Sequence, residues 1–257
     1  MIKKWSITIP ELTGKETRNA YVYVPDSWLR NRKQRFPVLY MFDGHNIFYD
    51  EDATYGKSWG MLEYMQKTQT PMIIAAVECN HGPNHDRLKE YAPYSFDDEG
   101  LGHIEGKGHI TMKWLTRVFK PMVDRKFPTL PDREHTFIAG SSMGGLMSLY
   151  AITKFNRYFS RAACLSPSIW FGPEKLDRIL MQSAISPNTV VYMDYGAKEL
   201  PNHKSMRRQF RRVASRLLDR DIMLTCRIIP GGDHSEASWE KQIPFFMNTL
   251  LYGLEDS

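Results

Sequence analysis

The segment Gly140-Ser141-Ser142-Met143-Gly144 has the residue types and spacing of a serine nucleophile on a sharp turn. An apolar run over residues 135–139 precedes it and a helix-like run over residues 146–152 follows, which is the order strand, turn, helix. Such a reversal brings the residues two before and two after the apex so close that a Cβ at either place would collide with the other. The pattern predicts a strained backbone at Ser142, with the N-terminal end of a helix beneath its hydroxyl.

A serine hydroxyl is a weak nucleophile at neutral pH and therefore needs a neighbouring base. His234 is the candidate, because it follows the last predicted strand, and parallel strands end at the same edge of a sheet. Two carboxylates, Asp194 and Glu199, follow the preceding strand, and either could orient the imidazole. We favour Glu199, which lies on the turn beyond that strand, and keep Asp194 as the alternative. The chain order Ser142, Glu199, His234 is typical of a nucleophile elbow.

An ester attacked by Ser142 would form a tetrahedral intermediate with an oxyanion, which backbone N–H groups must stabilise. The first expected donor is the N–H of Met143, directly after the nucleophile. The second is expected in the polar loop Gly44–Asn46, which follows the strand at Val38. Within that loop we favour the N–H of His45.

The side chains predicted to contact the substrate are those of Asn46, Arg87 and Trp170. Arg87 could meet an acidic group of the substrate, or it could pair with Glu90 on the same turn. Trp59 and Tyr91 could line an apolar acyl or aryl site, although core packing suits Trp59 equally well.

Short apolar runs alternate with helical patterns along the chain. Strands are predicted at residues 5–10, 20–24, 36–42, 72–77, 135–139, 161–165, 189–194 and 223–229, and helices at 58–69, 111–127, 146–152, 202–220 and 238–251. Residues 79–110 are predicted to form a long loop of the functional or mobile kind. The first two strands alternate and indicate an antiparallel hairpin, whereas the later apolar runs suit strands buried on both faces. The expected fold class is an α/β sandwich with a mainly parallel sheet.

Composition limits the architecture and the classes of partner. The 257 residues, 42% of them hydrophobic, suit one domain over residues 1–257. The formal net charge of +5 comes from 34 basic residues mixed with 29 acidic ones, so no nucleic-acid partner is expected. No run approaches the roughly 18 apolar residues of a membrane span, and the start has no cleavage signal. The three widely spaced cysteines suggest reduced thiols, so a cytoplasmic location is expected, while the oligomeric state is not indicated.

With these residues in place, the chain resembles the putative-esterase family of α/β-hydrolases, which includes enterochelin (siderophore) esterases, feruloyl esterases, S-formylglutathione hydrolase and the mycolyltransferases. The resemblance covers nearly the whole chain. The segments that carry it are residues 40–48, 87–93, 140–145, 165–170, 194–199 and 232–234. The family usually has Gln where His45 stands. The resemblance implies an α/β-hydrolase fold, a three-layer sandwich without a large separate lid, and hydrolysis of a small ester without metal or cofactor.

Three other functions are open to the same residues. An acyltransferase would use the same triad and differ only in the group that attacks the acyl-enzyme. A metal site could use Cys79, His81 and His85. His45 could join them, but Cys-x-His-x-x-x-His is not a recurrent zinc spacing. A non-catalytic binding module could use the basic helix at residues 204–220, whose apolar positions at helical spacing instead favour an ordinary solvated basic face.

Overall fold

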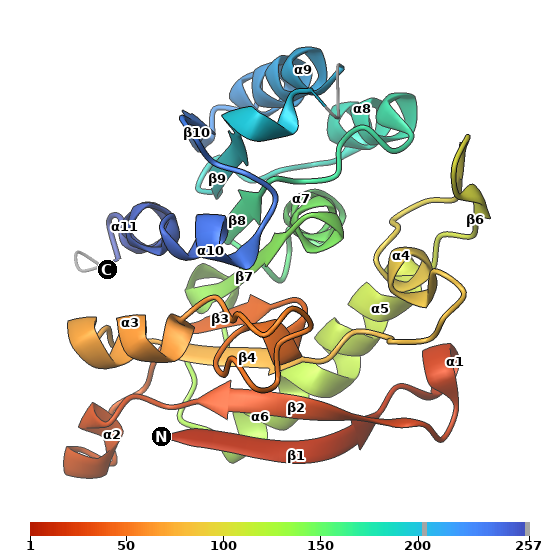
Figure 1. The fold of residues 1–257 in the computed structure, drawn as a ribbon. Helices are drawn as coiled ribbons and strands as arrows, with labels where there is room; N and C mark the ends of the chain where they lie inside the picture. Colours follow the sequence, from red (N-terminus) through yellow and green to blue (C-terminus); the bar gives the residue numbers. More distant parts are fainter. Residues whose placement is uncertain (202–204, 255–257) are drawn as a thin grey trace.

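A central sheet organises the structure, a computed structural model that describes residues 1–201 and 205–254. Within these residues the sheet has eight strands in the order β1-β2-β4-β3-β7-β8-β9-β10 (Figure 1). The strands are β1 Ile2–Thr8, β2 Thr17–Tyr23, β3 Val38–Met41, β4 Ile73–Val77, β7 Thr136–Ser141, β8 Arg161–Leu165, β9 Val190–Gly196 and β10 Met223–Ile229. β2 pairs antiparallel with both β1 and β4, whereas the remaining pairs are parallel. The predicted hairpin and the mainly parallel sheet are therefore confirmed.

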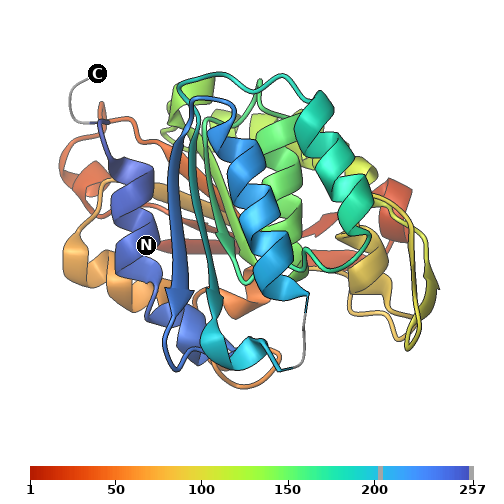
Figure 2. The same ribbon diagram turned by 90° about the horizontal axis from the view of Figure 1, so that it is seen from above.

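Helices cover both faces of the sheet and make a three-layer sandwich (Figures 1 and 2). The helices are α1 Pro10–Thr13, α2 Ser27–Arg30, α3 Met61–Thr68, α4 Asp86–Glu90, α5 Gly108–Trp114, α6 Lys120–Lys126, α7 Met143–Lys154, α8 Pro173–Gln182, α9 Met206–Leu218, α10 Glu236–Glu240 and α11 Ile243–Leu251. Short 3₁₀ turns are η1 Gly44–Asn46, η3 Arg133–His135 and η4 Ala197–Glu199, and η2 Leu115–Phe119 is a π-helical turn. Helices α5 to α9 pack in the core on one face, and α3, α10 and α11 in the core on the other.

The burial of the strands follows their sequence patterns. Every residue of β3, β7 and β9 is buried, as continuous apolar runs between two helical layers predict. The edge strand β1 is intermediate or exposed throughout. The fully buried strands end at one edge of the sheet, where the loops that follow them meet.

The structure differs from the predicted elements at several points. Residues 79–110 are not one loop, because they hold α4 and a hairpin of β5 Phe96–Asp98 and β6 Gly102–Ile104, which projects beside α4 in Figure 1. The helix predicted at residues 238–251 is two helices, and Pro244, near the start of α11, lacks the N–H that a continuous helix needs. Helix α8 was not anticipated. The predicted helix at 202–220 is seen as α9, and its first residues, 202–204, lie outside the described part of the chain.

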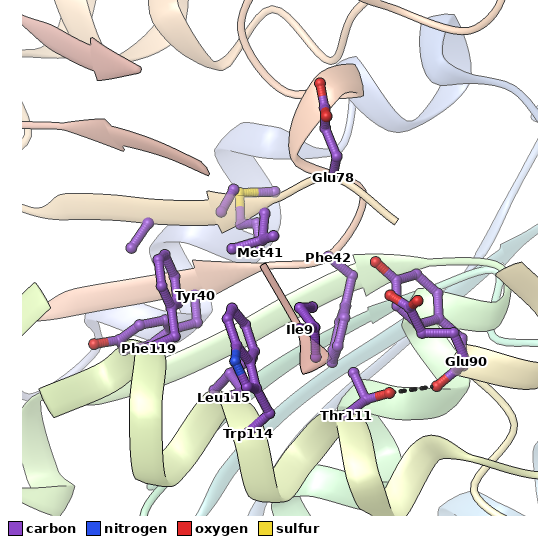
Figure 3. A pocket seen from close by; sticks show the side chains of 14 residues that line it. Ile9, Tyr40, Met41, Phe42, Glu78, Glu90, Thr111, Trp114, Leu115 and Phe119 are labelled. Atoms are coloured by element: carbon purple, nitrogen blue, oxygen red, sulfur yellow. Dashed lines mark hydrogen bonds between the residues drawn. The ribbon is translucent and has the colours of Figure 1, made fainter. Parts of the chain in front are cut away.

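A small cavity of about 20 Å³ lies between the sheet and α5 (Figure 3). Next to it the Thr111 hydroxyl donates to the Glu90 carbonyl at 2.7 Å. The Glu90 carboxylate forms a buried ion pair with Arg18 at 2.7 Å. Glu90 therefore does not pair with Arg87, which was one of the predicted alternatives. The volume suffices for about one water molecule, so this cavity is no candidate for a substrate.

None of the helices in the described residues combines the length and the apolar character that crossing a bilayer requires.

Candidate active site

The predicted nucleophile elbow is present between β7 and α7. Ser142 has φ 57° and ψ −123° and stands directly before the first residue of the helix. A Cβ on Gly140 would lie 2.7 Å from the carbonyl carbon of Gly144, which is too close for any side chain. The sequence predicted that a Cβ on Gly144 would collide with Gly140. In the structure a Cβ there would instead first meet the Cβ of Phe42, at 3.0 Å. The close approach of the strand and the helix at the turn, which requires glycine at position 140, thus holds Ser142 in its strained conformation.

Three backbone hydrogen bonds hold the apex in place. The Ser142 N–H donates to the Leu165 carbonyl at 3.0 Å, and the Ser142 carbonyl accepts from the N–H groups of Leu146 and Ser168, each at 3.0 Å. The Ser142 hydroxyl lies 3.4 Å from that of Ser168. No hydrogen bond between described residues joins Ser142 to His234 directly. Both side chains nevertheless line one cavity of about 660 Å³.

His234 and Glu199 meet as the sequence predicted. The Nδ1 of His234 lies 2.7 Å from the Oε2 of Glu199, whose side chain is 2% exposed. Glu199 lies in η4, directly beyond β9, and His234 lies in the loop after β10. Burial alone would raise the pKa of Glu199, but the hydrogen bonds from His234, Ser166 and the Gly196 N–H lower it overall. Glu199 is therefore a carboxylate at neutral pH, able to hold an imidazolium.

Ser166 supports this carboxylate and was not found by sequence reasoning. Its hydroxyl donates to Glu199 Oε1 at 2.6 Å and accepts from the Trp239 indole N–H at 3.1 Å. The Gly196 N–H also donates to Glu199 Oε1, at 2.7 Å. Ser166 follows β8 with φ 40°, so its place at the carboxyl end of a central strand was the available signal.

The alternative carboxylate, Asp194, points elsewhere. It lies within β9, is 1% exposed and accepts from the Tyr192 hydroxyl at 2.7 Å. The Ser166 N–H lies 3.3 Å from its Oδ1. Burial raises the pKa of Asp194 to about 7, in spite of these two hydrogen bonds, which lower it. Of the two candidates, the structure brings only Glu199 into contact with His234.

The raised pKa of Asp194 predicts a pH-dependent stability. An unfolded chain releases this proton near pH 4, whereas the native state keeps it up to about pH 7. Between these values the native state binds more protons, so the free energy of unfolding falls as the pH rises, by at most about 4 kcal/mol. We expect Asp194→Asn to make this decline smaller, as measured by urea unfolding at about pH 4.5 and 7.5. The decline that remains is attributed to buried Glu90, whose pKa is also raised, to about 7, and which titrates in both proteins. Equal pH dependence of the two proteins would contradict the prediction.

The loop after β3, residues 43–46, is held against β4 and α4. A Cβ on Gly44 would lie 2.8 Å from the carbonyl carbon of Val77, so the loop packs tightly on the end of β4. Asp43 has φ 57° and accepts two hydrogen bonds from the guanidinium of Arg87, at 2.7 and 2.6 Å. Its backbone N–H donates to the Tyr91 hydroxyl at 3.1 Å. Burial would raise the pKa of Asp43, but the charge and hydrogen bonds of Arg87 lower it overall.

The two predicted oxyanion donors lie at the starts of helical turns. Met143 is the first residue of α7, and His45 is the second residue of η1. The first N–H groups of a helix have no partner within the helix, so both are available in principle to an oxyanion. His45 is 4% exposed, and burial lowers the pKa of its imidazole.

The predicted substrate contacts have mixed outcomes. Asn46 lines the cavity, but its amide oxygen accepts from the Thr54 N–H at 3.0 Å. Arg87 lines it too, with its guanidinium in the ion pair with Asp43. The ring of Trp170 lies 6.3 Å from that of His234. Trp59 and Tyr91, at 2% exposure each, pack in the two cores.

The candidate metal ligands also meet, although not as the set that the spacing suggested. One donor atom each of His45, Cys79 and His81 lies within 4.8 Å of the others. His85 is the N-cap of α4 and is not in this group. All three cysteines, Cys226 included, are free thiols.

The sheet order, with an elbow between the fifth strand and its helix, defines the fold as that of an α/β-hydrolase. Residues 12–249 match the family model described as putative esterase. The chain therefore belongs to the putative esterase family, and is a carboxylic ester hydrolase.

Comparison with individual proteins agrees with this family. The uncharacterized protein YbbA of Bacillus subtilis is 25% identical over 251 residues, covering 92% of this chain and 93% of that protein. The enterobactin esterase FES of Shigella flexneri, in the presence of enterobactin, superposes with a TM-score of 0.75 at 16% identity, over 99% of this chain and 59% of that one. The siderophore hydrolase EstA of Aspergillus nidulans superposes with a TM-score of 0.70 at 17% identity, over 96% of this chain and 94% of that one. At these identities the structural likeness concerns the fold alone.

Proposed function

We propose that the protein hydrolyses small carboxylic esters through an acyl-enzyme on Ser142. His234 acts as the base and then the acid, and Glu199 orients its imidazole. The observation that carries the proposal is the 2.7 Å contact between His234 and a buried carboxylate, at a cavity that a strained serine also lines. Hydrogen bonds between catalytic groups are often long without substrate and shorten in the complex, so the absence of a direct Ser142–His234 bond is compatible with this mechanism.

The proposed chemistry follows from the proton balance. The Ser142 Oγ attacks the ester carbonyl carbon while its proton passes to Nε2 of His234, whose Nδ1–H donates to Glu199. The oxyanion accepts from the N–H groups of Met143 and His45. The C–O bond to the alcohol then breaks, and the alcohol leaves with the proton from Nε2. Water attacks the acyl-enzyme by the same steps, and the acid and free Ser142 are released.

The lining of the cavity indicates which esters suit it. Asn46, Asn80 and His81 present polar groups, and Trp239 adds an apolar wall next to His234. The charge of Arg87 is already matched by Asp43. We therefore propose that Arg87 holds the loop at residues 43–46 in place, and that the substrate is a small acyl, aryl or siderophore-type ester with polar groups. The similarity to enzymes named for enterobactin and siderophore hydrolysis supports the last of these classes.

We also propose that residues 1–257 form one esterase domain, and that it works in the cytoplasm, which the three free thiols support. An acyltransferase is the second candidate function, because another alcohol could replace water in the attack on the acyl-enzyme.

The proposal is tested by trapping the nucleophile. A p-nitrophenyl alkylphosphonate is expected to release one equivalent of p-nitrophenolate and to leave the phosphonyl group on the peptide that holds Ser142, as located by mass spectrometry. Ser142→Ala should not be labelled, whereas Ser168→Ala, which removes the neighbouring hydroxyl, should be. Label on another residue would refute the assignment. Product analysis with an added alcohol then separates hydrolysis from acyl transfer.

A further inference from the structure

Three side chains that bind transition metals meet on one wall of the large cavity. His45 comes from the loop after β3, and Cys79 and His81 follow β4. One donor atom of each lies within 4.8 Å of the other two. The rings of His45 and His81 are edge to face, with their centroids 4.5 Å apart. Neighbouring parallel strands β3 and β4 thus bring together residues from two separate loops.

His45 shows a second, independent feature that points to a ligand. Its Nε2 lies 2.9 Å from the Thr54 hydroxyl, whereas its Nδ1 is buried and has no hydrogen-bond partner among residues 1–201 and 205–254. The residue is 4% exposed. A buried polar atom left without a partner is destabilising, and a ligand on Nδ1 would remove that cost. A histidine that binds a metal through one nitrogen and an oxygen through the other has this arrangement.

We propose that His45, Cys79 and His81 bind a divalent transition metal ion such as Zn²⁺. Thiolate and imidazole are ligands that zinc favours. Zn–N and Zn–S distances of about 2.1 and 2.3 Å place tetrahedral ligands roughly 3.5 Å apart. The observed spread requires only a small inward movement, which the exposed side chain of His81 permits.

The surroundings of the site tolerate the added charge. Cys79 binds the ion as a thiolate, and its proton passes to solvent on binding. The positive charge of Arg87 is matched by the two hydrogen bonds to Asp43, so the dication does not face an unpaired cation. Three protein ligands leave the fourth position of the ion open.

The location of the site makes the ion an inhibitor. His45, Cys79 and His81 line the same cavity as Ser142 and His234. A bound ion would fill the space that the ester needs, next to the His45 N–H that we assign to the oxyanion. This consequence rests on the proposed function, whereas metal binding itself does not.

Binding is tested with Co²⁺, a spectroscopic substitute for zinc, and by calorimetry with Zn²⁺. The wild-type protein should bind one ion and show a thiolate-to-cobalt charge-transfer band. We expect His81→Asn to weaken binding at least about tenfold, since one of three ligands is lost. The matched control is His85→Asn, which changes the next histidine of the same segment, at a positive φ that asparagine tolerates. Cys226→Ser controls for the exposed thiol.

Cys79→Ser should remove the charge-transfer band, and the thermal unfolding of each variant shows whether it has folded. If Cys79→Ser does not fold, the affinity of His81→Asn alone tests the site, because the His81 side chain is exposed and its replacement should not disturb folding. Equal affinities of the wild type and His81→Asn, or a cobalt complex without the thiolate band, would overturn the site.

Inhibition is tested by ester hydrolysis with and without Zn²⁺, each variant being compared with its own metal-free rate. The wild type and His85→Asn should lose activity with the same zinc dependence as binding, and His81→Asn should need at least about tenfold more zinc. Binding without inhibition would overturn the position of the ion in the substrate cavity. A protein that binds zinc but hydrolyses no ester would contradict the proposed function and leave the metal site standing.

Discussion

Ser142→Ala is expected to lower kcat for p-nitrophenyl acetate by at least about a thousandfold. The hydroxyl of Ser142 is the only proposed nucleophile, and alanine leaves the cavity, His234 and the backbone donors in place. Because the whole covalent pathway is lost, the fall should appear in kcat and kcat/KM alike. The measurement is steady-state hydrolysis, with thermal unfolding to show that the variant has folded.

The matched control for that variant is Ser168→Ala. The hydroxyl of Ser168 lies 3.4 Å from that of Ser142, and the residue is 1% exposed. We expect this substitution to change kcat by less than about tenfold. A thousandfold loss in Ser168→Ala with little change in Ser142→Ala would mean that Ser168, rather than Ser142, is the nucleophile. Unchanged turnover in both variants would exclude a nucleophile at this turn.

Glu199→Gln is expected to lower kcat by at least about a hundredfold. Glu199 Oε1 accepts from Ser166 and Gly196, so the new amide nitrogen would face His234 Nδ1. That nitrogen donates where the carboxylate accepted, which places the imidazole proton on Nε2 and leaves no acceptor for the Ser142 proton. The loss should therefore lie in kcat rather than in KM.

The matched comparison is Asp194→Asn, a similar change to a buried carboxyl in β9, five residues before Glu199. Asp194 contacts Tyr192 and Ser166 rather than His234, so we expect a loss of less than about tenfold. Steady-state kinetics of both variants under the same conditions settle the choice. A larger loss in Asp194→Asn than in Glu199→Gln would mean that the triad acid has been assigned to the wrong carboxylate.

The elbow and the bounds of two strands could be predicted from the sequence, because interactions between residues close in the sequence largely determine them. The local part of the elbow is the need for glycine at position 140, because a Cβ there would meet the backbone of Gly144, whereas the close neighbour of Gly144 itself is Phe42, which is distant in sequence. The strands Arg161–Leu165 and Met223–Ile229 have the predicted bounds, because apolar runs between turn residues mark both ends. The contact of His234 with Glu199 was also predicted, because parallel strands end at one edge.

Other contacts between distant loops were not predicted. For Arg87 the sequence left two alternatives, an acidic group of the substrate or nearby Glu90, whereas its partner in the structure is Asp43, which the order of β3 and β4 brings to it. The zinc spacing rule considered Cys79, His81 and His85 as one continuous segment, with His45 as a possible further ligand. The structure replaces His85 with His45 from another strand's loop, and no spacing rule covers that combination.

Short elements were missed for a different reason. The strands of the β5–β6 hairpin have three residues each and include polar side chains, so they show no periodicity. Helix α8 begins at Pro173, directly after Gly172. A glycine followed by a proline resembles a loop when read alone, although proline suits the first turn of a helix.

The backbone around the cavity holds non-glycine residues at positive φ, namely Asp43, Ser142 and Ser166. Such residues cost of order 1–3 kcal/mol each and persist where the surroundings enforce them. Selection for heat resistance alone would therefore favour glycine or a relaxed backbone at these three positions. Such changes would raise the free energy of unfolding and lower the hydrolase activity. Engineering of more robust variants should accordingly leave these turns untouched and look to the distant β1–β2 edge of the sheet.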